Sequence, residues 1–158
     1  MSLFERPRAR LERLLEVGQA GVEAGTQAGA DLGQPAAHLG GDRLDAVATF
    51  NEPWCSVWLS HLYGVHAPGE RNMDAALHAL HYTNLAHGLS VQAIREIAPN
   101  VPVGLVLNAH ETLPGSESAA DLAAAERAHQ FHNGVFFDPV FKGEYPAEFL
   151  SALGHRMP

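Results

Sequence analysis

Apolar positions in the C-terminal two thirds of the chain follow patterns typical of alternating strands and helices. Residues 45–51 and 101–108 form short apolar stretches, and the second is nearly continuous, as in a parallel strand covered on both faces. Between them, residues 72–96 repeat apolar positions at spacings of three and four, which predicts a long helix. A strand, a crossover helix and a strand make a βαβ unit, so the pattern predicts an α/β fold with a parallel sheet.

Two more helices are predicted after the second strand. Residues 118–132 form the first, with Ser118 as a plausible N-cap and Asp121 three residues later. Residues 146–153 form the second, because Pro146 suits a first helical turn and a glycine follows the last apolar position.

The connections that follow the two strands are longer than minimal loops. Residues 53–71 carry Gly64, Pro68 and Gly69, which predicts a loop with a short helical turn around residues 56–62. Residues 109–117 form the other long connection. Chemistry in parallel sheets lies beyond the carboxyl ends of the strands, so Glu52 and these loops are the first place to look for a site.

The N-terminal segment differs from the rest in composition. Residues 3–17 could form a short amphipathic helix, but residues 18–41 are rich in glycine, alanine and glutamine, with few large apolar side chains. Such a stretch buries little surface and loses much backbone entropy on ordering. We therefore divide the chain into a flexible segment, residues 1–40, and an ordered domain, residues 41–158.

The composition of the chain fits a globular protein. It has 158 residues, 46% hydrophobic and 18% charged, which suits one domain. A net charge of −8 argues against nucleic acid or an anionic membrane as partner. Cys55 is the only cysteine, so no internal disulfide forms, and neither a signal peptide nor a membrane-spanning stretch is recognisable. These observations predict a cytoplasmic protein.

The segment with the clearest chemical content is Thr-Phe-Asn-Glu-Pro-Trp, residues 49–54. Pro53 disfavours the helical conformation for Glu52, so the chain there should be extended or turning. A carboxylic acid can protonate a glycosidic oxygen, an amide such as Asn51 can bind a hydroxyl, and an indole such as Trp54 can stack on a sugar ring. The segment therefore favours work on a sugar.

This hexapeptide resembles the acid/base motif of the family 1 glycoside hydrolases, the β-glucosidase family. Further segments resemble the same family, in its order and at about its spacing, over residues 41–158. They are Gly64–Gly69, Leu85–Gly88, Val103–Asn108, Phe137–Pro139 and Gly143–Pro146. The resemblance implies a TIM-type (β/α)8 barrel, of which this chain would hold about two βα units, the fourth and fifth, with long βα loops.

The resemblance also implies roles for single residues. Glu52 corresponds to the catalytic acid/base of a retaining mechanism, and Asn51 to the residue that holds the sugar 2-hydroxyl. Trp54 and Trp58 could line the aglycone side, and core packing is an equal alternative for both. The substrate would be a β-glucoside or a related small oligosaccharide, and the chemistry requires no cofactor.

Retaining hydrolysis needs a second carboxylate as nucleophile, which the family carries in a Glu-Asn-Gly motif. That motif is absent from this sequence, and Glu111 is interpreted as a loop acid. The chain should therefore carry the acid/base half of a site, be inactive and marginally folded alone, and self-associate through exposed barrel edges. A truncated or frame-disrupted reading frame would explain this. The alternative is a non-catalytic sugar-binding or interaction protein derived from such a hydrolase.

Ten histidines raise the question of a metal site. His78 and His81 lie three residues apart on a predicted helix, but no acid flanks them at ligand spacing. His87 is expected to pack within the fold and to be hydrogen-bonded. His110, His129 and His132 look scattered. The sequence predicts no metal site and no phosphate-binding loop.

Overall fold

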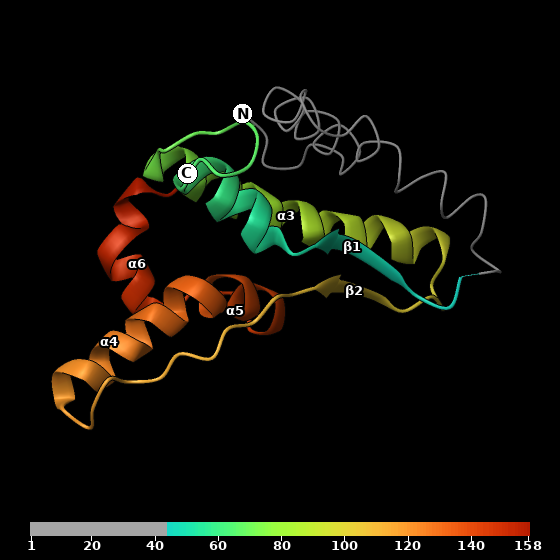
Figure 1. Cartoon of the computed structure of the whole chain (residues 1–158). Coiled ribbons are helices and arrows are strands. Elements are labelled where there is room, and N and C mark those ends of the chain that lie inside the picture. The colour runs from blue at the N-terminus through green and yellow to red at the C-terminus, as the bar shows by residue number, and fades with distance from the viewer. Residues whose placement is uncertain (1–43) are drawn as a thin grey trace. The chain divides into compact units, whose positions relative to one another are not determined.

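The computed structural model describes residues 44–158, so the expectations for residues 1–40 lie outside the described part of the chain (Figure 1). The described elements run, in order, β1 (Val47–Asn51), η1 (Cys55–Leu62), α3 (Met73–Ile97), β2 (Val103–Val106), α4 (Ala119–His129), η2 (Gln130–Gly134), α5 (Val135–Phe141), α6 (Ala147–Leu153) and η3 (Gly154–Arg156). None of the helices within residues 44–158 is long and apolar enough to cross a membrane.

Strands β1 and β2 pair in a two-stranded sheet and are joined through α3 (Figure 1). The Val47 N–H donates to the Pro102 carbonyl at 2.9 Å, and the Glu52 N–H donates to the Val106 carbonyl at 2.8 Å. Both strands advance in the same direction between these bonds, so the pair is parallel. The βαβ prediction and the α/β class are confirmed.

The prediction that residues 101–108 form a strand covered on both faces is wrong for one face. β2 is four residues long and alternates between half-buried and exposed positions, with Val106 44% exposed. Alternation of this kind marks a strand with one open face. The apolar run led us to expect coverage of both faces, but the face that carries Gly104 and Val106 is exposed within residues 44–158.

The described chain forms two compact units, each with its own segments. One unit, named unit 1, includes residues 44–49 and 85–104, and the other, unit 2, comprises residues 50–84 and 105–158. Both the sheet and α3 contribute to each unit.

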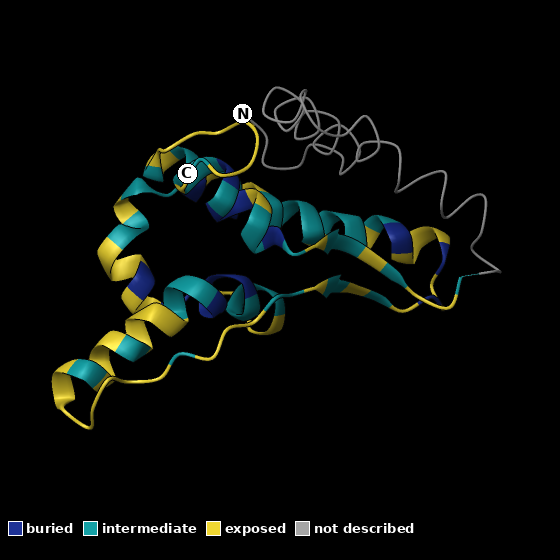
Figure 2. Ribbon diagram, in the orientation of Figure 1, coloured by how far each residue is buried: buried dark blue, intermediate teal, exposed yellow. Residues whose placement is uncertain are grey.

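The main hydrophobic core lies in unit 2, where it appears dark blue along η1, α3 and α5 in Figure 2. Its buried residues come from these elements and from α6; they are Val57, Trp58, Ala76, Leu77, Leu80, Val135, Phe136 and Phe149. The Trp58 ring stacks on Phe131 with centroids 4.5 Å apart. The helical turn expected around residues 56–62 is the π-helix η1, and its buried residues Val57 and Trp58 belong to this core.

Unit 1 buries less apolar surface. Its buried apolar residues are Ile94, Ala98 and Val101, near the end of α3 and the start of β2. Thr49 ties this unit together, since its Oγ1 lies 2.7 Å from Nδ1 of His87 and donates to the Gly104 carbonyl at 3.3 Å. The prediction that His87 is hydrogen-bonded is confirmed, and its side chain is half-buried.

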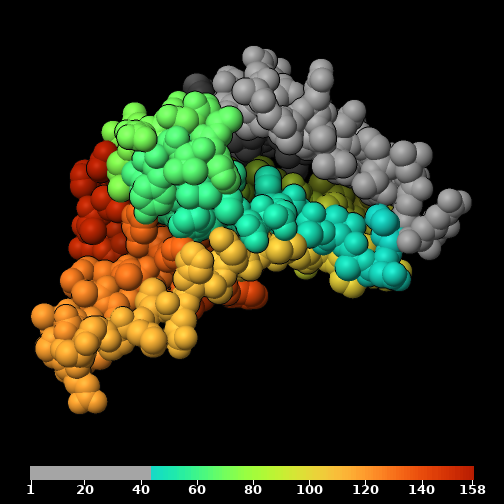
Figure 3. Space-filling model, in the orientation of Figure 1, coloured from blue at the N-terminus to red at the C-terminus, as the bar shows by residue number. Residues whose placement is uncertain are grey.

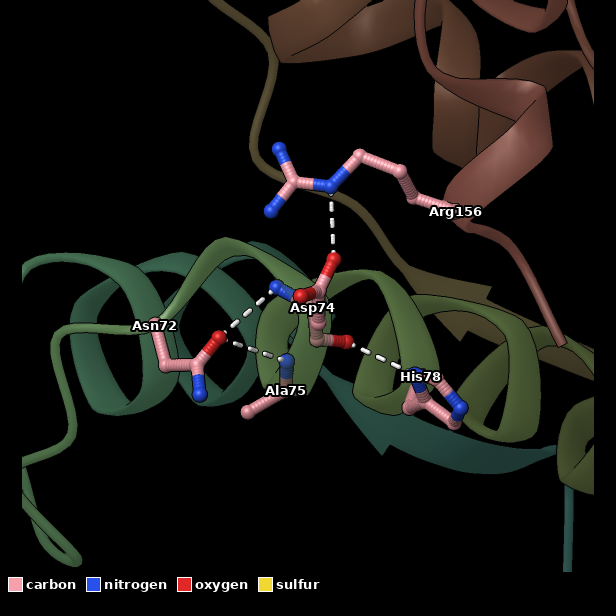
Figure 4. A network of polar contacts seen from close by, with 5 residues as sticks. All are labelled: Asn72, Asp74, Ala75, His78 and Arg156. Carbon is pink, nitrogen blue, oxygen red and sulfur yellow. Dashed lines mark hydrogen bonds and ion pairs between the residues drawn. The ribbon is translucent and has the colours of Figure 1, made fainter.

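A network of polar contacts fixes the start of α3 (Figure 4). Asn72 Oδ1 accepts from the N–H groups of Asp74 and Ala75 at 2.9 and 3.4 Å, as an N-cap does. The Asp74 carboxylate pairs with Arg156 Nε at 2.6 Å, and His78 Nδ1 donates to the Asp74 carbonyl at 2.8 Å. These contacts join α3 to the end of η3.

Helix α4 begins as the sequence predicts, because Ser118 Oγ accepts from the Asp121 N–H at 3.1 Å. None of its residues is buried, and its orange surface is open on the face seen in Figure 3. The predicted end at His132 is wrong, since the helical path continues through η2 into α5. Gly134 is helical there, and a Cβ atom would come within 3.0 Å of Pro146 Cγ, so this glycine serves close packing and does not end the helix.

Helix α6 confirms the third helix predicted from the sequence. It begins after Pro146 and ends at Leu153, with Gly154 as its C-cap and Phe149 buried in the core of unit 2.

Candidate active site

Glu52 occupies a strained turn directly after β1. Its φ is 46°, in the left-handed region that residues other than glycine rarely adopt. The Glu52 N–H bonds to Val106, and the Glu52 carbonyl accepts from the Cys55 N–H at 2.9 Å, while buried Pro53 follows. Such a conformation persists only where its surroundings fix it, and it often marks a functional position. The chain turns here, as Pro53 led us to expect.

The Glu52 carboxylate lies one turn from a thiol. Cys55 Sγ donates to Glu52 Oε2 at 3.4 Å, and both side chains are half-buried. Burial, followed by the hydrogen bond and charge of Glu52, raises the pKa of the Cys55 thiol. The thiol therefore stays protonated and acts as a weak donor to this carboxylate oxygen.

Asn51 is the last residue of β1 and is exposed. Its carboxamide is therefore accessible at the strand end, one residue before Glu52. The binding role inferred for Asn51 needs such accessibility and stays a prediction.

Trp54 is half-buried within a group of aromatic rings. Its ring centroid lies 4.7 Å from His132, 5.8 Å from His110 and 6.4 Å from Tyr63. Its Nε1 is shielded from solvent, with no hydrogen-bond partner among the described residues. Stacking of Trp54 on a sugar stays a prediction. For Trp58 the packing alternative is confirmed, since it is 0% exposed.

Sequence reasoning missed one cluster beside Trp54. His110, His129 and His132 looked scattered, but His110 Nδ1 lies 3.3 Å from His132 Nδ1, and Asn133 Nδ2 donates to His129 Nδ1 at 3.1 Å. The spacing of 129, 132 and 133 places these residues on one helical side, which is the signal that could have found them. The partner, His110, comes from a distant loop that only the tertiary fold brings close.

No group of three or more histidine, cysteine, aspartate or glutamate side chains in residues 44–158 is arranged to hold a metal ion. His81 is half-buried, and burial, assisted by the charge of His78, lowers its pKa. Glu111, the loop acid, is exposed.

Comparison with known proteins gives one consistent result. Residues 37–158 match Glycosyl hydrolase family 1. A β-glucosidase of Agrobacterium sp. is 77% identical over 118 residues, which are 75% of this chain and 26% of that enzyme. This chain thus spans about a quarter of that relative's length.

Two solved structures are similar as well. The virulence factor SghA of Agrobacterium tumefaciens, also solved with its substrate analog salicin, is 71% identical with a TM-score of 0.78, over 82% of this chain and 29% of its own. The family 1 β-glucosidase of Thermotoga maritima is 34% identical with a TM-score of 0.78, over 91% of this chain and 32% of its own.

The match to the family covers most of this chain, and it includes the segment in which Glu52 directly follows a strand of a parallel sheet. The chain belongs to glycosyl hydrolase family 1.

Proposed function

We propose that this chain carries the acid/base half of the active site of a retaining β-glucosidase, on about the fourth and fifth βα units of the family's barrel. The observation that supports this most is the position of Glu52. Its carboxylate follows the carboxyl end of β1, and a left-handed turn with two backbone hydrogen bonds holds it there. Reacting groups of (β/α) barrels come from this end of the strands.

In the proposed mechanism Glu52 acts twice. Its protonated carboxyl first donates a proton to the glycosidic oxygen as the bond to the leaving group breaks. Its carboxylate then removes a proton from the water that hydrolyses the glycosyl-enzyme. The Cys55 thiol bonds Oε2, which leaves Oε1 as the oxygen better placed for proton transfer.

The nucleophile of this mechanism is a second carboxylate about 5–5.5 Å from the first. The Glu-Asn-Gly motif that carries it in the family does not occur in residues 1–158. We infer that a polypeptide segment outside this sequence supplies that carboxylate, and that this chain alone does not hydrolyse glycosides.

Asn51 is proposed to donate its amide hydrogens to the sugar 2-hydroxyl. This contact strengthens as positive charge develops at the anomeric carbon, so it favours the transition state over bound substrate. The exposed position of Asn51 at the end of β1 leaves its amide free to do so.

The proposed substrates are terminal β-glucosides, including those with an aromatic leaving group. Relatives described as β-glucosidases and the SghA complex with salicin support this choice. The rings of Tyr63 and His110 lie next to Trp54, which is two residues from the proposed acid/base along the chain, so Trp54 is proposed to contribute to the leaving-group side.

The test uses a chimera in which residues 41–158 replace the matching segment of the Agrobacterium sp. β-glucosidase, 77% identical over 118 residues. Glu52→Ala should cost roughly 10²–10⁴-fold in kcat/KM on alkyl glucosides, whose leaving groups need a proton. On an activated dinitrophenyl glucoside, whose leaving group needs no proton, the rate of glycosyl-enzyme formation should fall much less. Equal losses in that step on both substrates would refute the role of Glu52, and an inactive unmutated chimera would refute the proposed function.

A further inference from the structure

Asn133, in η2, holds the loop that follows β2 at two points. Its Oδ1 accepts from the His110 N–H at 3.0 Å, and its Nδ2 donates to the His110 carbonyl at 2.7 Å. Asn133 is only 4% exposed. A buried amide that loses one of its partners is costly, so this pair of bonds fixes the backbone at His110 strongly.

The backbone position of His110 in turn fixes its ring. The His110 and His132 rings lie against each other, tilted by 38° with centroids 3.7 Å apart, and their Nδ1 atoms lie 3.3 Å apart, within hydrogen-bond distance. One Nδ1 must donate and the other accept, so the two rings cannot both carry a proton at Nδ1. Burial, and then the charge of His110, lowers the pKa of His132.

Both imidazoles lie against Trp54, which is two residues from Glu52 along the chain. Every member of this set belongs to unit 2, so the contacts form one continuous path from η2 to the turn after β1. The other titratable groups in contact with the path are Tyr63, beside Trp54, and His129, beside Asn133.

We propose that Asn133 is a positioning residue of the candidate active site: by holding the His110 backbone, it fixes the two imidazoles against Trp54, two residues from Glu52 along the chain. The importance of Asn133 for catalysis rests on the proposed function. The claim that Asn133 fixes the rings around Trp54 rests on the contacts above, and it is tested without measuring glycoside turnover.

The experiment is ¹⁹F NMR of the full chain labelled with 5-fluorotryptophan. The chain has two tryptophans, and Trp54→Phe assigns the signals. In the unmutated chain the Trp54 signal should be distinct from free 5-fluorotryptophan. It should also shift in a step with pH, below the ordinary pKa of histidine, because His132 takes up a proton only there.

Asn133→Ala should move the Trp54 signal more than half of the way to that of free 5-fluorotryptophan, and should move the pH step to higher pH. Asn133→Asp keeps the acceptor to the His110 N–H and loses the donor, so it should move the signal in the same direction by less. If Asn133→Ala gives no cooperative melt, the Asp variant decides. His110→Ala, which keeps Asn133, should also raise the pH of the step.

The matched control is Asn84→Ala. Asn84 also uses its amide in unit 2, donating to the Val135 carbonyl at 3.0 Å and to the Tyr145 hydroxyl at 3.2 Å. It should leave the Trp54 signal and its pH step in place. The proposal is overturned if folded Asn133 variants keep the unmutated Trp54 signal and step, if Asn84→Ala disturbs them equally, or if the unmutated chain shows two coincident signals.

Discussion

Unit 2 contains the whole of the main hydrophobic core, whereas unit 1 buries only Ile94, Ala98 and Val101 among its described apolar residues. The proposed site residues Asn51 and Glu52 both belong to unit 2. Helix α3 shows the same difference within one element, since its first half faces the core and its second half buries little. The comparison teaches that the candidate site is built on the part of the chain with its own packed interior.

The largest expected effect is on the core of unit 2. Trp58→Ala empties the space of a fully buried ring, which typically costs about 3–5 kcal/mol, so the variant should lose its cooperative thermal transition. Ile94→Ala in unit 1 should cost about 2 kcal/mol. Near-UV circular dichroism and melting of both variants measure the difference. Equal destabilisation would remove the distinction between the units.

The second effect sharpens the link between unit 2 and chemistry. In the chimera, Asn51→Ala should lower kcat by roughly 10–100-fold with a smaller change in KM, since a hydrogen bond worth about 1–3 kcal/mol in the transition state is lost. With a 2-deoxy glucoside as substrate, the mutation should change kcat very little. If kcat falls equally on the 2-deoxy and the parent substrate, Asn51 acts structurally.

A third effect concerns pH and unit 1. Burial lowers the pKa of His87, so the folded state binds a proton less readily than the unfolded state does. The free energy of unfolding is therefore highest above the ordinary histidine pKa, and it declines as pH falls below that value, because protonation of His87 favours the unfolded state. The amide protection factors in residues 44–49, which are exchange rates corrected for the intrinsic effect of pH, should therefore fall in mild acid. His87→Gln, which cannot titrate, should remove most of that fall, and protection factors that do not change with pH in the unmutated chain would contradict this account.

The smallest effects are at the start of α3 in unit 2. Asn72→Ala removes an N-cap and should cost about 1 kcal/mol in a thermal or denaturant melt. Arg156→Ala should change stability less, because its ion pair with Asp74 is on the surface. A larger loss for Arg156→Ala than for Asn72→Ala would show that this prediction is wrong.

The same ion pair gives a pH prediction. The hydrogen bond from Arg156 lowers the pKa of Asp74, so its contribution is present above the ordinary carboxyl value and is lost as pH falls through the lowered one. Arg156→Ala should raise the pKa of Asp74 toward its ordinary value, as measured by NMR titration of the carboxyl carbon. An unchanged titration would show that the pair does not form in solution.

Local patterns in the sequence predicted most of the fold. Apolar spacing found β1, α3 and β2, and capping residues found the starts of α4 and α6. The helical path through η2 into α5 was missed because Gly134 allows close packing against Pro146. That tertiary contact cannot be read from the local sequence. The exposed face of β2 was missed because an apolar run cannot tell whether other elements cover it.

The candidate site was likewise predicted only in part from the sequence. The motif around Glu52 pointed to the strand end and to a turn, but the left-handed conformation depends on the bond to Val106 of the neighbouring strand. The packing of Trp54 against His110 and His132 depends on three distant segments, and no local spacing could reveal it.

The most direct test of the account is chemical rescue of Glu52→Ala in the chimera, with a dinitrophenyl β-glucoside as substrate. Without the base, the glycosyl-enzyme should accumulate, and azide, which needs no base, should attack it. We predict that added azide restores turnover and that the product is the β-configured glucosyl azide, identified by ¹H NMR. A variant that azide does not accelerate, or one that forms no glucosyl azide, would contradict the assignment of Glu52 as the acid/base.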